Sequence, residues 1–253
     1  MKLNHKILGE GTPIVILHGL FGMLDNWMTF GKALAEKYKV ILVDHRNHGK
    51  SPHSDEISFE LYAQDLKELL DDLNIPRAYV LGHSMGGKTA MYFATRYPKS
   101  TLGIISVDIG AHGYYKGNHD EIFDAILPID LNKYERRGEI DDTLSTKISI
   151  LPIRQFLLKN LSRTESGYKW KANFQVLHDQ YDEIRKAVPE GSLYEGPSLI
   201  IRGGNSPYVR IQDMEYIQSI FPAVLLETVE NAGHWIHAEK PKELLGIVHD
   251  FLE

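Results

Sequence analysis

The chain has 253 residues, of which 43% are hydrophobic and 25% charged, a composition typical of a soluble globular protein with one or two domains. Its 28 Lys and Arg residues against 34 Asp and Glu residues give a net charge of −6. This balance argues against a nucleic-acid partner, because binding to phosphate backbones needs a net basic face. The absence of cysteine excludes disulfides, thiolate nucleophiles and Cys-ligated metal sites.

Short apolar runs alternate along the chain with segments of helical periodicity. Tyr62, Leu66, Leu69 and Leu73 form one apolar stripe at helical spacing, and residues 90–97 and 244–252 form two more. The alternation predicts an α/β fold, with a mostly parallel central sheet and helices on both faces. Continuous apolar runs, typical of strands buried on both faces, occur at residues 14–17, 40–43, 78–81, 104–107, 198–201 and 224–226.

The alternation stops between residues 111 and 196. This stretch has no clear strand, and its helical segments lie at about 153–161 and 174–184. We expect it to be a helical cap inserted over the carboxyl edge of the sheet, where open α/β folds bind their ligands. The predicted organisation is therefore a core of residues 1–110 and 197–253, with a cap of residues 111–196.

The sequence Leu-Gly-His-Ser-Met-Gly-Gly-Lys-Thr, residues 81–89, follows a predicted strand and opens a predicted helix. Gly82, Ser84 and Gly86 form the pattern G-x-S-x-G, in which a sharp turn exposes a nucleophilic serine above the sheet. The amide of Met85 would then be one donor of the oxyanion hole.

The same residues satisfy a second pattern. Gly82, Gly87, Lys88 and Thr89 match G-x-x-x-x-G-K-[ST], the phosphate-binding P-loop of nucleotide hydrolases. A P-loop NTPase is therefore an alternative function. Under the serine-hydrolase interpretation, Lys88 is expected to be a solvent-exposed helix residue.

Two other segments favour the serine hydrolase, since a nucleotide site does not explain them. The sequence His-Gly-Leu-Phe-Gly at 18–22 follows an early strand, and the backbone amide of Leu20 or Phe21 would supply the second oxyanion donor. His234 follows the last predicted strand and would be the general base. Trp235 either lines the substrate pocket or packs against the edge of the sheet.

The segments 18–22, 25–27, 44–52, 82–88, 108–110, 203–209 and 232–241 carry a resemblance that extends over nearly the whole chain. On these residues the chain resembles the α/β-hydrolase superfamily and is most similar to the small bacterial YbfF-type acyl esterases. The resemblance implies an acyl-transfer activity that uses a serine nucleophile.

The acid that orients the base is harder to assign. Members of the superfamily often place it just after the strand that follows the cap, but here that position holds Asn205 or Ser206, neither of which carries a charge. Asp108 ends the preceding strand at the same sheet edge, and the resemblance also implies an acid at this strand. We predict Asp108, with a structural role in the turn as its alternative, whereas Asp213 lies too far into the next helix.

His45, His48 and His53 lie close together in the sequence, but no metal-binding spacing includes them. We expect a surface loop fixed by Asp44, with neither a metal nor a cofactor. His18 and His83 are expected to hold neighbouring loops through hydrogen bonds.

The sequence thus predicts a serine hydrolase with the triad Ser84, Asp108 and His234. It would cleave small-molecule carboxylic esters or thioesters of small acyl groups through an acyl-enzyme. A hydrolase-like receptor with little turnover is the other alternative. The sequence shows no signal-peptide pattern and no apolar run of about 18 residues, so the expected location is cytoplasmic, without a membrane partner. No oligomeric state is predicted.

Overall fold

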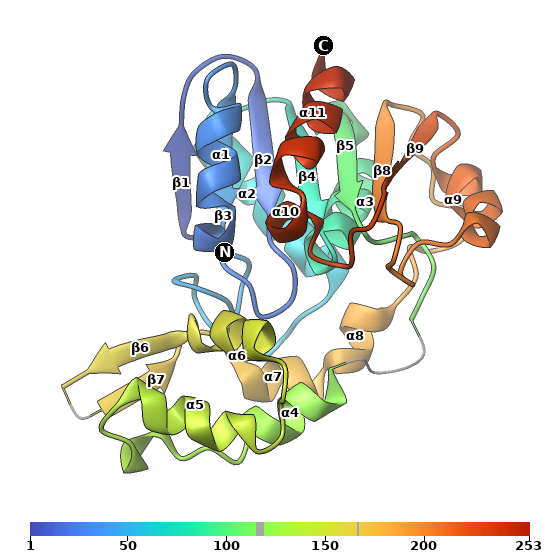
Figure 1. The fold of residues 1–253 in the computed structure, drawn as a ribbon. Coiled ribbons are helices and arrows are strands. Elements are labelled where there is room, and N and C mark those ends of the chain that lie inside the picture. The colour runs from blue at the N-terminus through green and yellow to red at the C-terminus, as the bar shows by residue number, and fades with distance from the viewer. Residues whose placement is uncertain (115–118, 166) are drawn as a thin grey trace.

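The computed structural model describes residues 1–114, 119–165 and 167–253. Its centre is a seven-stranded sheet in the order β1-β3-β2-β4-β5-β8-β9 (Figure 1). β1 runs antiparallel to β3, and the other neighbouring pairs are parallel. The strands span His5–Leu8 (β1), Pro13–Leu17 (β2), Lys39–Val43 (β3), Ala78–His83 (β4), Thr101–Val107 (β5), Ser198–Gly203 (β8) and Val224–Val229 (β9).

All six predicted strand segments lie within this sheet. β1 was not predicted, because it is an edge strand whose four residues are exposed or half-buried and form no apolar run. The predicted α/β class with a mostly parallel sheet is confirmed.

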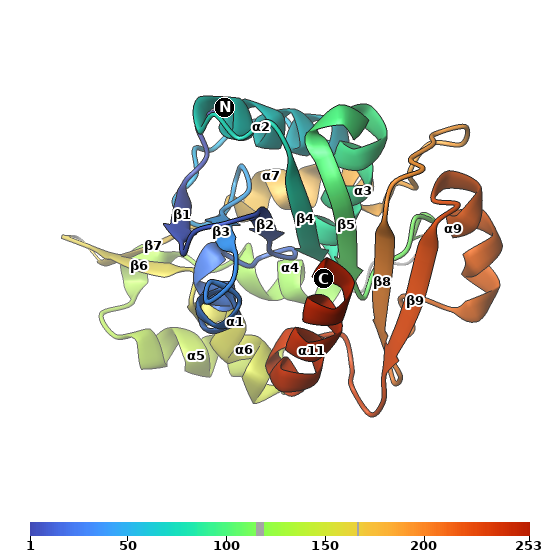
Figure 2. The ribbon, with the colours of Figure 1, turned by 90° about the horizontal axis from the view of Figure 1, so that it is seen from above.

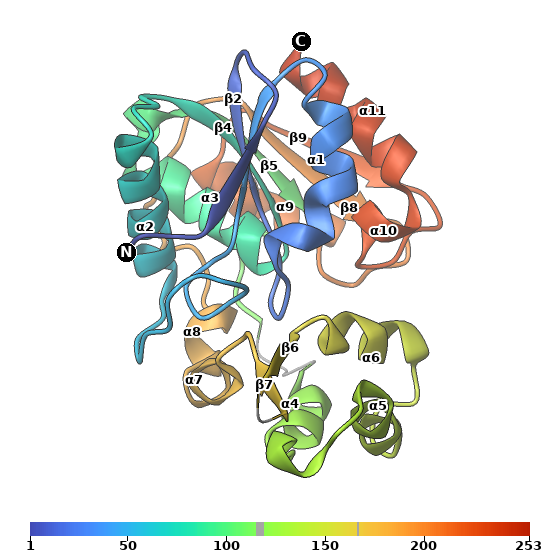
Figure 3. The ribbon, with the colours of Figure 1, turned by 90° about the vertical axis from the view of Figure 1, so that its left-hand side faces the viewer.

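Helices cover both faces of the sheet (Figures 2 and 3). One face packs against α2, Phe59–Asp72, α3, Met85–Arg96, and α9, Met214–Ile220. The other packs against α1, Met28–Leu34, α10, Ile236–Glu239, and α11, Pro241–Leu252. The three predicted helical stripes fall on α2, α3 and α11. No helix in the described ranges combines the length and apolar character that crossing a membrane requires.

The segment between β5 and β8 lies beyond the carboxyl ends of the parallel strands (Figures 1 and 3). Its two predicted helical segments are largely helical, but the expectation that it holds no strand is wrong. β6 and β7 form an antiparallel hairpin. Each strand has only four residues of mixed polarity, three of them half-buried and one exposed, so neither produces a continuous apolar run. The elements are α4, Asp120–Ile126, α5, Arg137–Ser145, α6, Leu151–Leu158, β6, Leu161–Thr164, β7, Gly167–Trp170, α7, Phe174–Asp179, and α8, Tyr181–Arg185.

Candidate active site

Ser84 alone connects β4 to α3, and it adopts φ 53° and ψ −120°. Its amide donates to the carbonyl oxygen of Val107 at 3.0 Å. The turn is so tight that a Cβ on Gly82 would lie 2.1 Å from the backbone of Gly86, which explains why glycine is needed there. The strained serine is thus held at the carboxyl edge of the sheet and at the amino end of a helix.

The structure contradicts the P-loop alternative. A P-loop needs a loop of several residues whose amides surround phosphates, but β4 ends at His83 and α3 begins at Met85. The expectation that Lys88 is solvent-exposed is also wrong, since only 1% of the residue is exposed. Its Nζ donates to the carbonyl oxygen of His112 at 2.5 Å, because the segment after β5 folds over this face of α3. Burial lowers the pKa of Lys88 to about 7.

Asp108 and His234 are brought into direct contact. Asp108 lies just beyond β5 and is fully buried, and its Oδ2 is 2.7 Å from Nδ1 of His234. The amide of Gly203 donates to Oδ1 at 2.9 Å, and the hydroxyl of Ser206 donates to Oδ2. These three donors suit a carboxylate that only accepts hydrogen bonds. Asp213 instead pairs with the guanidinium of Arg210.

His234 is held on two sides. The ring of Tyr208 stacks on its imidazole, with the ring centroids 4.1 Å apart. His83 donates from Nε2 to the carbonyl oxygen of His234 at 2.8 Å, which confirms the expected loop-holding role of His83. Ser84 and His234 line one cavity of about 50 Å³. In the described part of the chain, His234 is bonded to Asp108 and no hydrogen bond joins the side chains of Ser84 and His234. Catalytic hydrogen bonds of this kind are often long without substrate and tighten only when it binds.

Of the predicted oxyanion donors, Met85 is the first residue of α3, so its amide has no partner within the helix. The amide of Phe21 donates to Nε2 of His48 at 3.2 Å. The amide of Leu20 donates to no protein acceptor in the described ranges, and Leu20 lines the cavity beside Ser84. The geometry therefore leaves the amides of Met85 and Leu20 available to an oxyanion, whereas that of Phe21 is already engaged.

The first part of the loop after β3, residues 44–49, is buried, so the expectation of a surface loop is wrong for His45 and His48, whereas His53 is exposed. Only 2% of His45 is exposed, and His48 is fully buried. Asp44 fixes this loop as predicted, because its carboxylate accepts from the amides of Leu24 and Lys50 at 2.7 and 2.9 Å.

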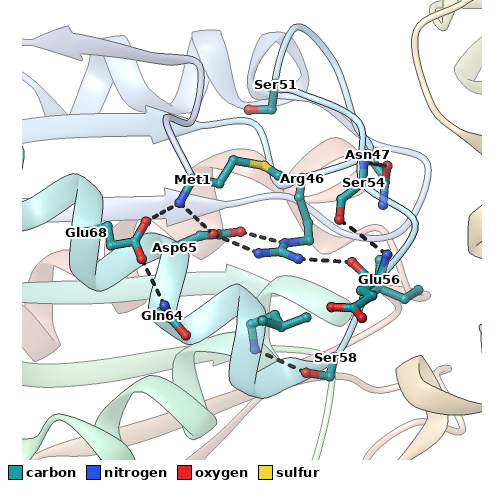
Figure 4. Close-up of polar contacts among 12 residues, drawn as sticks. Met1, Arg46, Asn47, Ser51, Ser54, Glu56, Ser58, Gln64, Asp65 and Glu68 are labelled. Carbon is teal, nitrogen blue, oxygen red and sulfur yellow. Dashed lines mark hydrogen bonds and ion pairs between the residues drawn. The ribbon is translucent and has the colours of Figure 1, made fainter.

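Arg46 anchors the same loop to α2, as Figure 4 shows. Its guanidinium donates to the carboxylate of Asp65 at 2.7 and 2.9 Å and to the carbonyl oxygen of Glu56 at 3.0 Å. Both members of this ion pair are buried. A loop held by a buried, two-pronged ion pair is a rigid support for the histidines that it carries.

Trp235 lies in the wall of the cavity that contains Ser84. A larger groove of about 590 Å³ adjoins it, and Asn26, Phe156, Trp235 and His237 line both. The groove opens between α1, α6 and α11 and is mostly apolar, with Lys159 and Lys242 among its residues.

Sequence reasoning did not assign site roles to Ser206, Tyr208 or His119. Ser206 and Tyr208 contact Asp108 and His234, and the glycine-rich segment 203–209 was the only sequence signal near them. His119 lines the cavity from the region between β5 and β8, and its Nδ1 lies 2.6 Å from the hydroxyl of Tyr181. No local pattern identifies His119, because its place depends on how that region folds.

Comparison with known proteins agrees with this fold. A family model described as alpha/beta hydrolase fold matches residues 12–137 and 148–241. Esterase YbfF of Escherichia coli (strain K12) is 36% identical over 259 residues, which cover 100% of this chain and 99% of that protein. The sn-1-specific diacylglycerol lipase ABHD11 of Mus musculus is 37% identical over 100% of this chain and 85% of its own. A solved structure described as a marine microorganism esterase has a TM-score of 0.96 and 36% identity, with 99% of each chain covered.

Proposed function

Because the chain belongs to the α/β-hydrolase fold family, we propose that it is a carboxylesterase-type serine hydrolase whose catalytic triad is Ser84, Asp108 and His234. The family membership confirms the predicted fold and the resemblance to YbfF-type esterases. One observation carries the assignment of the triad. The carboxylate of Asp108 lies 2.7 Å from Nδ1 of His234, and Ser84 occupies a strained turn in the wall of the cavity that His234 also lines.

The reaction proceeds in two acyl-transfer steps. His234 accepts the proton of the Ser84 hydroxyl at Nε2 while the serine oxygen attacks the carbonyl carbon of the substrate. Asp108 holds the proton of His234 on Nδ1 and stabilises the imidazolium that forms. The amides of Met85 and Leu20 donate to the oxyanion. His234 then returns the proton to the leaving group, and water hydrolyses the acyl-enzyme by the same route.

The cavities beside Ser84 support small acyl groups. One of about 50 Å³ lies on the side of Trp235, and another of about 40 Å³ lies on the side of Met85. Neither reaches the ~300 Å³ at which pockets for drug-sized ligands begin. The adjoining groove of about 590 Å³ offers room for a larger alcohol or thiol group. In this proposal Trp235 separates the cavity of about 50 Å³ from the groove. The substitution Trp235→Ala would join these two volumes and should therefore widen the range of acyl chains that are accepted.

Two further parts of the proposal rest on the sequence. Thioesters are included as substrates because the same oxyanion donors and nucleophile serve both ester types. We also propose a cytoplasmic location, which cell fractionation would test, and a division into a core of residues 1–110 and 197–253 with a cap of residues 111–196.

The decisive experiment measures turnover of p-nitrophenyl esters with acyl chains of two to twelve carbons, together with matching thioesters. The wild type should prefer the short chains, and Ser84→Ala should lower kcat by about 10⁴–10⁶. Wild-type protein that binds these esters but turns none over would instead favour the receptor alternative. Unchanged turnover in Ser84→Ala would remove the assignment of the nucleophile.

A further inference from the structure

The loop beside the nucleophile contains a turn with an unusual residue. The amide of Gly22 donates to the carbonyl oxygen of Gly19 at 3.0 Å, which closes a four-residue turn. Phe21, its third residue, has φ 61°, whereas Leu20 is not among the residues with positive φ. This is the pattern of a type II turn, which favours glycine at the third position. A phenylalanine there is strained, so contacts outside the turn must hold it.

Two histidines hold the turn from the core. His18 donates from Nδ1 to the carbonyl oxygen of Gly19 at 2.8 Å. Because the peptide group is planar and trans, this bond also fixes the direction of the Leu20 amide, which points the opposite way. A Cβ on Gly19 would lie 3.2 Å from that of Ser84, so the turn abuts the nucleophile directly.

The second histidine is fixed in one tautomer. His48 donates from Nδ1 to the carbonyl oxygen of Arg46 at 3.0 Å, which leaves Nε2 to accept from the amide of Phe21. Burial lowers the pKa of His48 to about 3 and that of His18 to about 4, so both are neutral near pH 7. Arg46 is itself held by Asp65 (Figure 4), which makes this side of the turn rigid.

The third contact comes from the region between β5 and β8. Asn160, which lies between α6 and β6, donates from Nδ2 to the carbonyl oxygen of Phe21 at 2.8 Å. Asn160 is fully buried, and its Oδ1 has no hydrogen-bond partner. An unpaired buried oxygen destabilises the fold, so packing does not explain an asparagine at this position. The ring of Phe21 also contacts Phe123 of α4 and Phe174 of α7.

We propose that Asn160 is a positioning residue for the oxyanion hole. Its side chain holds Phe21 in the left-handed conformation, and this keeps the amide of Leu20 directed at the reacting carbonyl oxygen. The proposal rests on the proposed serine-hydrolase function. It means that the cap does more than cover the substrate, because one of its side chains completes the catalytic geometry of the core.

The test compares Asn160→Ala with Asn173→Ala on p-nitrophenyl acetate. Asn173 is the matched control, since its Nδ2 also reaches from the same region to the core, where it donates to Oδ1 of Asn47 at 3.3 Å and not to a residue of the oxyanion turn. We expect Asn160→Ala to lower kcat by about 10- to 100-fold, less than the ~10²–10³-fold loss of a direct oxyanion donor. KM should change by less than about threefold, because the oxyanion develops only in the transition state. Asn173→Ala should keep kcat within about threefold.

Active sites are counted in each sample by the p-nitrophenol released from diethyl p-nitrophenyl phosphate, so that loss of folded protein is not mistaken for loss of kcat. Equal effects of the two substitutions, or a change in KM alone, would overturn the proposal.

If Asn160→Ala does not fold, Asn160→Asp gives the same test. Its carboxylic acid can donate to Phe21 but its carboxylate cannot, so its kcat relative to the wild type should fall as the pH rises. A pH-independent ratio would overturn the proposal.

The outcomes separate this inference from the proposed function. If the wild type is active and Ser84→Ala is not, but Asn160→Ala matches the wild type, only the role of Asn160 fails. If Ser84→Ala keeps its turnover, the proposed function itself fails.

Discussion

The substitution Asp108→Asn tests how the acid controls the base. The amide of Gly203 donates to Oδ1 at 2.9 Å, so the asparagine oxygen is expected to remain there and its NH₂ to replace Oδ2. That NH₂ would face Nδ1 of His234 across 2.7 Å. A donor opposite Nδ1 moves the ring proton to Nε2, the atom that must accept the proton of Ser84. The variant is therefore expected to fold and to rest in an inactive tautomer.

Two costs set the size of the effect. To restore the active tautomer, the amide must turn its NH₂ toward the donor of Gly203, which costs about 1–3 kcal/mol for the lost and opposed hydrogen bond. The imidazolium then lacks a charged partner, which costs about 1.5–3 kcal/mol more. At ~1.36 kcal/mol per factor of ten, the sum of about 2.5–6 kcal/mol lowers kcat by about 10²–10⁴.

The assay is kcat at saturating p-nitrophenyl acetate, with circular dichroism to verify the fold. Asp213→Asn is the matched control, because Asp213 pairs with Arg210 and not with the base, and it should keep kcat within about twofold. If Asp108→Asn retained more than a tenth of kcat while Asp213→Asn lost most of it, the assignment of the acid would be refuted.

Three further predictions concern stability. Burial lowers the pKa of Lys88 from 10.5 to about 7, so between these values the unfolded chain binds more protons and the free energy of unfolding rises with pH, by up to about 1.4 kcal/mol per unit. Lys88→Met should lose this slope in urea denaturation at pH 7 and pH 9, and equal slopes would contradict the burial argument. Asp65→Asn leaves the buried charge of Arg46 without its partner and should lower the free energy of unfolding by about 3–5 kcal/mol, whereas a loss below about 1 kcal/mol would mean that Arg46 finds another partner. The melting temperature of Ser84→Gly should equal or exceed that of Ser84→Ala, because glycine tolerates φ 53°. In an unstrained helix or strand, by contrast, glycine is less stabilising than alanine by about 0.5–1 kcal/mol.

The sheet and the nucleophile turn were predictable because local sequence determines them. A strand buried on both faces must be apolar throughout, and the sharp turn at Ser84 requires Gly82 and Gly86 at fixed spacing. The prediction of Asp108 as the acid needed one more premise, namely that the carboxyl ends of parallel strands meet at a common edge of the sheet. The structure places Asp108 against His234 there, and substitution will test its role.

Features that depend on distant segments could not be predicted. Lys88 has the sequence context of an exposed helix residue, but it is buried, and its Nζ donates to His112 in the segment that follows β5. Asn160 and Phe21 are 139 positions apart, and no periodicity relates them. The four-residue strands of the β6–β7 hairpin are stabilised by pairing with each other, which a pattern of apolar residues does not reveal.

The strained residues of the described chain show how the site is built. The non-glycine residues with positive φ are Asn47, Asn74, Asn231, Phe21, Ser84 and Asp108. Asn and Asp tolerate this conformation, whereas it is strained for Phe21 and Ser84. The amide of Ser84 donates to the last residue of β5, and the amide of Asp108 donates to Ile201 in β8 at 2.7 Å. Ser84 and Asp108 are thus held by the hydrogen-bond register of adjacent strands, whereas Phe21 is held by side chains, several of which come from the segment between β5 and β8. Changes in that segment should therefore disturb the proposed oxyanion hole before they disturb the contact between Asp108 and His234.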